Sequence, residues 1–229
     1  SPMEEEFAMA NLSETSFMHG FYFPKTIMEN FNRSVVFEGE TEKNAAHWKK
    51  HFLFFLKKLA YKYPGKKLLL KSPANTGRLK EIYELFPDAR FIHIHRNPYD
   101  VYRSNERLYE RILPLTGFQK VSNEKIESYI IDSYEKMYRK YLRDRLLVPE
   151  NQLFEMSYDD FIHDPIVQLE KAYKHLGLKD FEAAVSEFKE EITGARGYKR
   201  NSYIDIPVEI KVRIQTQWRF AFEAFGYEV

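Results

Sequence analysis

Two cations of this chain stand directly after short apolar runs, at the start of predicted turns. Lys71 follows the run 68–70, and Arg96 follows the run 91–95. An apolar run that leads through a polar turn into a helical pattern predicts a strand-to-helix unit. Open α/β sheets bind anionic ligands at the carboxyl ends of their strands. The segment 67–109 therefore predicts two such units in tandem, each with a cation at its turn.

The second turn combines three features that suit a phosphate group. Arg96 offers a bidentate guanidinium, and the helix that begins at Pro98 offers its free N–H groups and the positive end of its dipole. Ser104, two turns on from Arg96, can donate one more hydrogen bond if the turn folds back over the helix start. The pattern alone has low specificity, because a cation before a helix is also an ordinary surface feature.

Taken together, the two turns resemble the centre of a sulfotransferase of the bacterial type that uses 3′-phosphoadenosine 5′-phosphosulfate (PAPS). Lys71-Ser72-Pro73 stands 25 positions before Arg96, and Ser104 occupies the matching later place. Further segments resemble the family in the family's order: Glu4–Met9, Met156–Phe161 with Asp164-Pro165, Tyr198–Tyr203, Trp218 and Phe225–Tyr227. The resemblance spans nearly the whole chain.

The resemblance implies a nucleotide site. Arg96 and Ser104 would bind the 3′-phosphate of PAPS. Tyr158 and the segment of Lys199 and Arg200 would close over the adenine and phosphate side.

The resemblance also implies a reacting centre at the first turn. Lys71 would lie beside the transferring sulfuryl group, where a fixed ammonium stabilises the charge that spreads over the equatorial and leaving oxygens. The acceptor hydroxyl needs a general base, and Glu6, beside Phe7, is the candidate. The alternatives are ordinary: Lys71 as a solvated lysine that ends a strand, and Glu6 as a solvated charge in an acidic run.

The implied fold is α/β: a three-layer, P-loop-NTPase-like parallel sheet flanked by helices, with high helix content. We expect residues 1–229 to form a single sulfotransferase-like domain that is incomplete at its N-terminus, because the family's glycine-rich loop for the 5′-phosphosulfate is not found in the sequence. Asn75 stands where many relatives carry histidine, so a histidine-based role at that position is excluded.

Helical periodicity supports this layout. It predicts helices over 44–63, 76–86, 122–147, 165–176 and 207–225, another from Pro98, and a strand at 153–156. The stretches 21–40, 113–121 and 194–206 are predicted to be flexible. The stretch 194–219 carries six basic residues against two acidic ones, which suits a lid over an anionic nucleotide.

Composition excludes several function classes. Basic and acidic residues number 35 and 34, so no electrostatic footprint favours nucleic acid or an anionic membrane as the main partner. The chain contains no cysteine, which excludes a disulfide, a thiolate nucleophile or a zinc–thiolate site. His93 with His95 and His47 with His51 have the spacing of ligand pairs, but buried structural histidines are commoner, and we expect no metal. No apolar stretch is long enough for a membrane span, and a cytoplasmic enzyme is the default expectation.

Three functions stay open at this point. The first is a PAPS-dependent sulfotransferase that acts on a hydroxyl or amine of a small molecule, lipid, glycan or tyrosyl side chain. The second is a nucleotide kinase or another phosphoryl transferase of related fold, and the third is a non-catalytic nucleotide-binding scaffold. The aromatic segment 17–37 is the candidate wall of the acceptor pocket. The sequence does not predict an oligomeric state.

Overall fold

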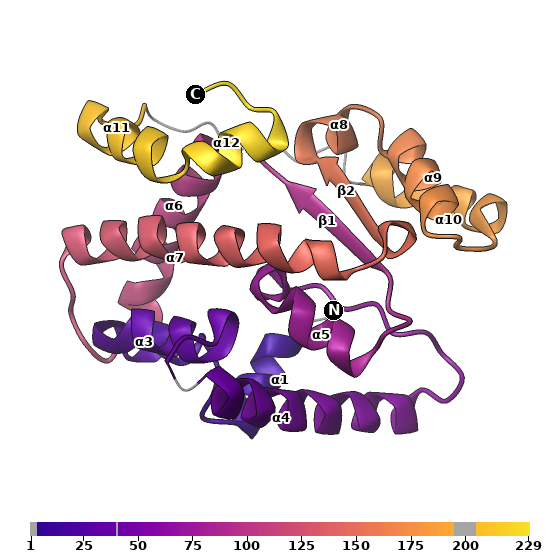
Figure 1. Cartoon of the computed structure of the whole chain (residues 1–229), viewed down its shortest axis with the longest axis horizontal. Helices are drawn as coiled ribbons and strands as arrows, with labels where there is room; N and C mark the ends of the chain where they lie inside the picture. The colour runs from indigo at the N-terminus through magenta and orange to yellow at the C-terminus, as the bar shows by residue number, and fades with distance from the viewer. Residues whose placement is uncertain (1–3, 40, 195–204) are drawn as a thin grey trace. The chain divides into compact units, whose positions relative to one another are not determined.

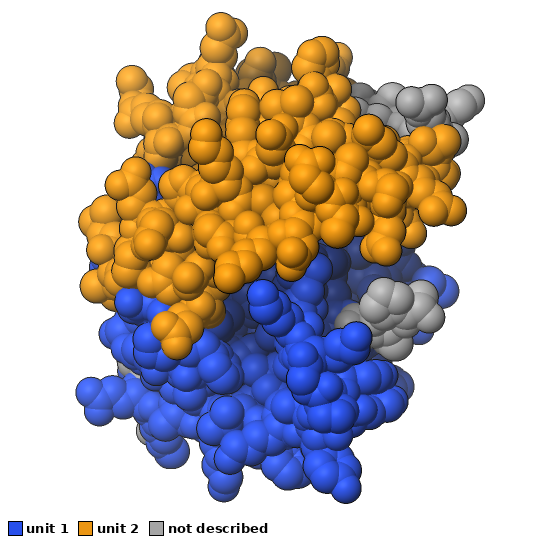
Figure 2. All heavy atoms as spheres, turned by 90° about the vertical axis from the view of Figure 1, so that its right-hand side faces the viewer, with its two compact units in different colours: residues 1–87, 104–145 blue, residues 88–103, 146–229 orange. Residues whose placement is uncertain are grey.

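A computed structural model describes residues 4–39, 41–194 and 205–229. They fall into two compact units, coloured separately in Figure 2. Unit 1 comprises Ser1–Pro87 and Ser104–Arg145, and unit 2 comprises Asp88–Arg103 and Leu146–Val229. The units are interleaved in the sequence, since the chain passes to unit 2 after Pro87, returns inside one helix, and leaves again after Arg145.

Unit 1 is helical. Its α-helices are α1 (Glu5–Leu12), α2 (His19–Tyr22), α3 (Ile27–Phe31), α4 (Thr41–Lys62), α5 (Leu79–Leu85) and α7 (Asn123–Asp144) (Figure 1). It also holds 3₁₀-helices at Pro24–Thr26 and Pro73–Arg78, the second of which is η3, and a π-helix at Asn32–Val36. Helix α6 (Pro98–Thr116) begins in unit 2 and ends in unit 1.

The core of unit 1 follows from helical spacing. Trp48, Phe52 and Leu56 recur every four residues along α4 and are buried, so they form the core-facing stripe that the periodicity predicts. Ser122 caps α7 by accepting a hydrogen bond from the N–H of Lys125 at 3.3 Å.

Unit 2 contains the sheet. Strand β1 (Phe91–His95) and strand β2 (Leu153–Ser157) are parallel, with Phe91 opposite Leu153 and His95 opposite Ser157. Because both strands end at the same edge and in register, Arg96 and Tyr158 follow them side by side. The helices of this unit are α8 (Tyr158–His163), α9 (Pro165–His175), α10 (Phe181–Gly194), α11 (Val208–Gln217) and α12 (Arg219–Phe225).

The structure corrects parts of the sequence prediction. Residues 68–70 form no strand: no described strand pairs with them, and Leu69 is 93% exposed. The stretch 21–36 holds several short helices instead of an irregular connection, since Phe21, Ile27 and Phe31 turn into the core. Helices α1 and α10 were not predicted. Most of 194–206 lies outside the described residues.

Candidate functional site

In unit 1, three consecutive glutamates each bind one residue of the segment that runs from Lys71 through η3. Glu4 forms an ion pair with Lys71. Glu5 accepts a hydrogen bond from Asn75 Nδ2 at 2.5 Å. Glu6 is paired with Arg78. The acidic segment and the Lys-Ser-Pro turn, which the sequence places far apart, therefore form one cluster.

The Glu6–Arg78 ion pair is buried, and both side chains make further hydrogen bonds. Arg78 Nη1 donates to Glu6 Oε2 at 2.6 Å, and the hydroxyl of Ser16 donates to Glu6 Oε1 at 2.8 Å. Arg78 Nε donates to the carbonyl of Ser34 at 2.7 Å, and its guanidinium lies over the ring of Trp48. Both side chains of the pair are essentially inaccessible to solvent.

This environment bears on the predicted role of Glu6. A general base must reach the acceptor's proton, whereas both carboxylate oxygens of Glu6 already accept hydrogen bonds within the fold. The geometry favours a role in which Glu6 holds η3 in place. Of the three glutamates, Glu4 is the one with its side chain partly in solvent, 27% exposed.

Lys71 is the solvent-exposed member of this cluster. Its side chain is 77% exposed, so its ammonium can exchange partners readily. Beside it in the chain, Ser72 Oγ and Asn75 Oδ1 are buried and have no hydrogen-bond partner among the described residues. Buried polar atoms without partners are costly, and a bound ligand or water would satisfy them. The turn is thus suited to polar contacts with a ligand.

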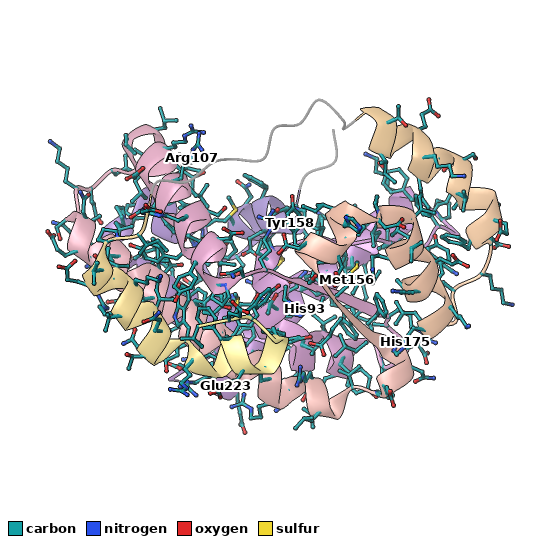
Figure 3. The ribbon with its side chains drawn as sticks, turned by 90° about the horizontal axis from the view of Figure 1, so that it is seen from above. His93, Arg107, Met156, Tyr158, His175 and Glu223 are labelled. Atoms are coloured by element: carbon teal, nitrogen blue, oxygen red, sulfur yellow. The ribbon has the colours of Figure 1, made fainter. Side chains whose placement is uncertain are left out.

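In unit 2, Arg96 stacks on an aromatic ring. Its guanidinium carbon lies 3.4 Å from the ring centroid of Tyr158. Tyr158 is the first residue of α8 and is labelled in Figure 3. Stacking on a ring face fixes the plane of the guanidinium and leaves its N–H groups in that plane to meet an anion. Arg96 Nε is buried, and within the described ranges no atom accepts a hydrogen bond from it. A phosphate oxygen would supply that acceptor.

The start of α6 contributes less than the sequence suggested. The side chain of Asn97 accepts a hydrogen bond from the N–H of Tyr99 at 2.9 Å, so one free donor of the helix is satisfied within the protein. Pro98 has no N–H to offer. At this turn, the guanidinium of Arg96 is the charged group that has a buried donor without a described partner.

The C-terminal residues fold back onto the strand that leads to Arg96. The ring of Phe225 stacks on His95 with a centroid separation of 4.5 Å. Tyr227 Oη lies 2.8 Å from His95 Nδ1 and donates to the carbonyl of His95 at 3.3 Å. Gly226 permits this return, because its φ of 72° is in the left-handed region. We call Phe225, Gly226 and Tyr227 the C-terminal clasp.

Burial shapes the titration of the clasp. It lowers the pKa of His95 to about 4, and the neighbouring His93 lowers it further, while Glu155 and Asp160 oppose the shift. Burial raises the pKa of Tyr227 to about 12, assisted by nearby aspartates. Tyr227 therefore keeps its proton at neutral pH and remains a hydrogen-bond donor beside Arg96.

The remaining predicted site residues are less defined. Ser104 lies in the interior of α6 and belongs to unit 1, whereas Arg96 belongs to unit 2, so each is described by itself. Lys199 and Arg200 lie outside the described residues. Sequence reasoning did not predict that Arg78 supports the first turn, or that His95 and Tyr227 contact each other next to Arg96. Only the closing Phe-Gly-Tyr, noted as a family landmark without a role, pointed to one of them.

The histidine pairs do not form a metal site in the part of the chain that is described. His93 is buried, with Nδ1 3.6 Å from a carboxylate oxygen of Glu155. His47 packs against His51 with their rings tilted by 40°, and it contacts the hydroxyl of Ser13. No group of three or more potential ligands among the described residues is placed to hold a metal ion.

None of the described helices is long and apolar enough to cross a bilayer.

The described residues form an α/β protein, and comparison with known proteins specifies its family. The model of the sulfotransferase family matches residues 6–183. The chain is similar to omega-hydroxy-beta-dihydromenaquinone-9 sulfotransferase Stf3 of Mycobacterium bovis and of Mycobacterium tuberculosis, at 33% identity over 79% of this chain in each case. It covers 46% of those relatives and so spans less than half of their length.

A solved structure shows the same fold. The crystal structure of sulfotransferase STF9 from Mycobacterium avium matches all of this chain and 57% of its own, with a TM-score of 0.77 at 18% identity. This likeness confirms the α/β fold class that the resemblance implied. The chain belongs to the sulfotransferase family.

Proposed function

We propose that this chain is part of an enzyme that transfers the sulfuryl group of PAPS to the hydroxyl of a lipid-like acceptor. The observation that carries the proposal is Arg96, stacked on Tyr158 with a buried donor available, in a chain of the sulfotransferase family. The named acceptor of the curated relatives, a hydroxylated menaquinone, supports a lipid-like acceptor over a glycan or a tyrosyl side chain. An amine acceptor has no such support.

In the proposed site, Arg96 and Ser104 bind the 3′-phosphate, and Tyr158 holds the guanidinium plane. Lys199 and Arg200 close over the nucleotide. The chemistry of Arg96 fits a phosphate. Its buried Nε has no described hydrogen-bond partner, and a phosphate oxygen would accept a hydrogen bond from it.

The proposed transfer is an in-line displacement at sulfur. The acceptor oxygen forms a bond to sulfur while the bond from sulfur to the 5′-phosphate oxygen breaks. That oxygen keeps the electron pair and leaves as part of 3′-phosphoadenosine 5′-phosphate, and the acceptor's proton passes to a base. Lys71 stabilises the charge on the leaving oxygen. Glu6 is the base that the sequence predicts, but its burial and its pairing with Arg78 favour a structural role, so Glu4 is the more accessible candidate.

The candidate acceptor wall is divided between core and surface. Phe21 is buried and contacts Phe17 and Tyr109, whereas Tyr22 is exposed. Replacing Tyr22 with Ala therefore tests the wall without emptying the core. An unchanged acceptor KM would remove this residue from the wall.

A cytoplasmic location remains a prediction of the sequence.

The proposal is tested by transfer of radiolabelled sulfuryl from PAPS. The assay uses this chain and the longest protein its gene encodes, with a hydroxylated isoprenoid quinone in detergent as acceptor and a tyrosyl peptide and a sugar as controls. We expect label on the quinone. Label on the peptide or the sugar alone would refute the lipid-like acceptor. Nucleotide binding without transfer to any acceptor would favour the non-catalytic scaffold, while the family match does not favour the kinase alternative.

A further inference from the structure

Unit 1 exposes four apolar side chains that come from two distant segments. Tyr22 and Phe23 follow one another at the end of α2, while Leu115 and Phe118 lie at and just beyond the end of α6. Their exposed fractions are 39%, 47%, 85% and 78% in that order. The ring of Phe118 lies 6.3 Å from that of Tyr22 and 5.9 Å from that of Phe23. Leu115 lies three residues before Phe118 in the chain. We call these four residues, three of which are aromatic, the aromatic ledge.

The aromatic ledge is held in place by hydrogen bonds. The N–H of Phe118 donates to the carbonyl of Tyr22 at 2.8 Å. The hydroxyl of Thr116 donates to the carbonyl of Phe21 at 3.2 Å, and the N–H of Lys25 donates to Gln119 Oε1 at 3.1 Å. These bonds join segments more than ninety residues apart. The fold therefore holds the rings of the ledge in place although they are exposed to solvent.

Lysines border the aromatic ledge. Lys25, Lys120 and Lys125 are exposed, and Lys125 Nζ donates to the carbonyl of Lys25 at 2.7 Å, which ties the two segments together once more. Within 22–25 and 114–125 the single acidic residue is Glu124, so these segments carry a local excess of positive charge although the whole chain is nearly neutral. Glu29, Glu110 and Arg111 flank them.

We propose that the aromatic ledge docks on a lipid bilayer that contains anionic phospholipids. Aromatic side chains favour the boundary between headgroups and acyl chains, and lysines beside them contact lipid phosphates. A second copy of the chain fits less well. If each residue offered about 200 Å² when fully exposed, the ledge would present roughly 500 Å², against about 800 Å² per partner in a stable interface.

This inference goes beyond the proposed transfer and does not depend on the acceptor. It concerns peripheral contact with a bilayer, for which no membrane-spanning helix is needed. It also differs from the expectation based on net charge, because attraction depends on the local charge of the docking surface within a Debye length.

Vesicle co-sedimentation tests the proposal without nucleotide or acceptor, so failure here leaves the proposed transfer untouched. Vesicles of phosphatidylcholine alone are compared with vesicles that contain one quarter phosphatidylglycerol. We expect binding to the anionic vesicles, and a loss of about tenfold or more in the partition coefficient for Leu115→Ser combined with Phe118→Ser. Tyr61→Ser is the matched control, because Tyr61 is 91% exposed on α4 of the same unit.

A second variant keeps the test independent of folding. Both native tryptophans, Trp48 and Trp218, are fully buried, so Phe118→Trp adds the single exposed indole. Its emission should shift to shorter wavelength when anionic vesicles are added. The proposal fails if the wild-type chain binds neither vesicle, if Tyr61→Ser weakens binding as much as the double variant, or if the chain forms a dimer that the double variant dissociates while vesicles bind nothing.

Discussion

The two turns that carry the predicted cations are built in opposite ways. In unit 1, the cations of the first turn are matched with carboxylates: Lys71 with Glu4, and Arg78 with Glu6. In unit 2, Arg96 stacks on an aromatic ring and keeps a buried donor that no described residue satisfies. A cation already paired must exchange partners before it meets an anionic ligand, whereas a stacked cation with an available donor is prepared for one.

This difference suggests a division of labour. We infer that unit 2 provides a preformed site for the permanent charge of a nucleotide phosphate. In unit 1, the buried Glu6–Arg78 pair holds the turn, and in the proposed function the exposed ammonium of Lys71 would stabilise the charge that develops during transfer. The following predictions test each half of the contrast, in order of expected effect.

The largest effect is expected from Arg78→Met. The change leaves the Glu6 carboxylate buried without its cation, which should lower the free energy of unfolding by about 3–5 kcal/mol. Urea denaturation measures the loss. Arg219→Met is the matched control, because the Arg219–Glu223 pair is exposed on both sides and should contribute little. Similar losses in the two variants would remove the claim that the Glu6–Arg78 pair frames the turn.

Arg96→Ala tests the stacked cation. It should weaken binding of 3′-phosphoadenosine 5′-phosphate by about 2–4 kcal/mol, because a desolvated phosphate loses a charge-assisted partner. Binding of adenosine 5′-phosphate, which lacks the 3′-phosphate, should change little. Calorimetry measures both ligands, and Arg139→Ala, an exposed arginine of α7, is the control. Equal losses for the two ligands would mean that Arg96 is structural.

Lys71→Ala tests the exposed cation of the first turn. The rate of sulfuryl transfer should fall about a hundredfold, the scale for removal of one group that stabilises transition-state charge. Affinity for 3′-phosphoadenosine 5′-phosphate should fall much less, and stability should hardly change because the side chain is 77% exposed. Single-turnover kinetics separate these effects. A loss of affinity as large as the loss of rate would place Lys71 in ground-state binding.

The C-terminal clasp gives a smaller, pH-dependent effect. The pKa of His95 is lowered from 6.5 to about 4 in the folded protein, so the unfolded chain takes up the proton first as pH falls. His95 therefore contributes a loss of stability as pH falls from about 6.5 to about 4, and none of this loss above that window. Urea midpoints across the window should decline less steeply in His95→Asn. An unchanged slope would show that His95 does not titrate as proposed.

The smallest change is expected from Tyr227→Phe, which removes one hydroxyl that bonds to His95. The unfolding free energy should fall by about 0.5–1.5 kcal/mol, the usual net contribution of a hydrogen bond. Tyr61→Phe, which alters an exposed hydroxyl, is the control. If the two variants unfold at the same urea midpoint, the bond from Tyr227 to His95 contributes nothing measurable to the clasp.

Sequence reasoning predicted the parts of the fold that depend on local patterns. The strand Phe91–His95, the start of α6 at Pro98 and the long helices α4 and α7 follow from periodicity, caps and proline, so short segments suffice to predict them. The apolar run 68–70 misled the prediction, because an apolar run becomes a strand only where a partner strand pairs with it. Helix α1 was missed, since its acidic and apolar residues show no clear helical face.

The candidate site was predictable only in part for a similar reason. Lys71 and Arg96 could be predicted because each stands at a turn next to a recognisable pattern. The partners of Lys71 and Arg96 are distant in sequence, since Lys71 pairs with Glu4, 67 residues away, and Arg96 stacks on Tyr158. The contact between Tyr227 and His95 spans 132 residues. Nothing local in the sequence reports such contacts. Whether Glu6 is a base or a structural carboxylate likewise depends on Arg78, which periodicity cannot pair with it.

The measurement that tests the central claim most directly is calorimetric titration of the chain with 3′-phosphoadenosine 5′-phosphate, with adenosine 5′-phosphate and ATP as controls. The account predicts binding that depends on the 3′-phosphate, because the stacked Arg96 provides a positive charge and a buried N–H donor for a phosphate oxygen. Equal affinity for adenosine 5′-phosphate, or a preference for ATP, would contradict it.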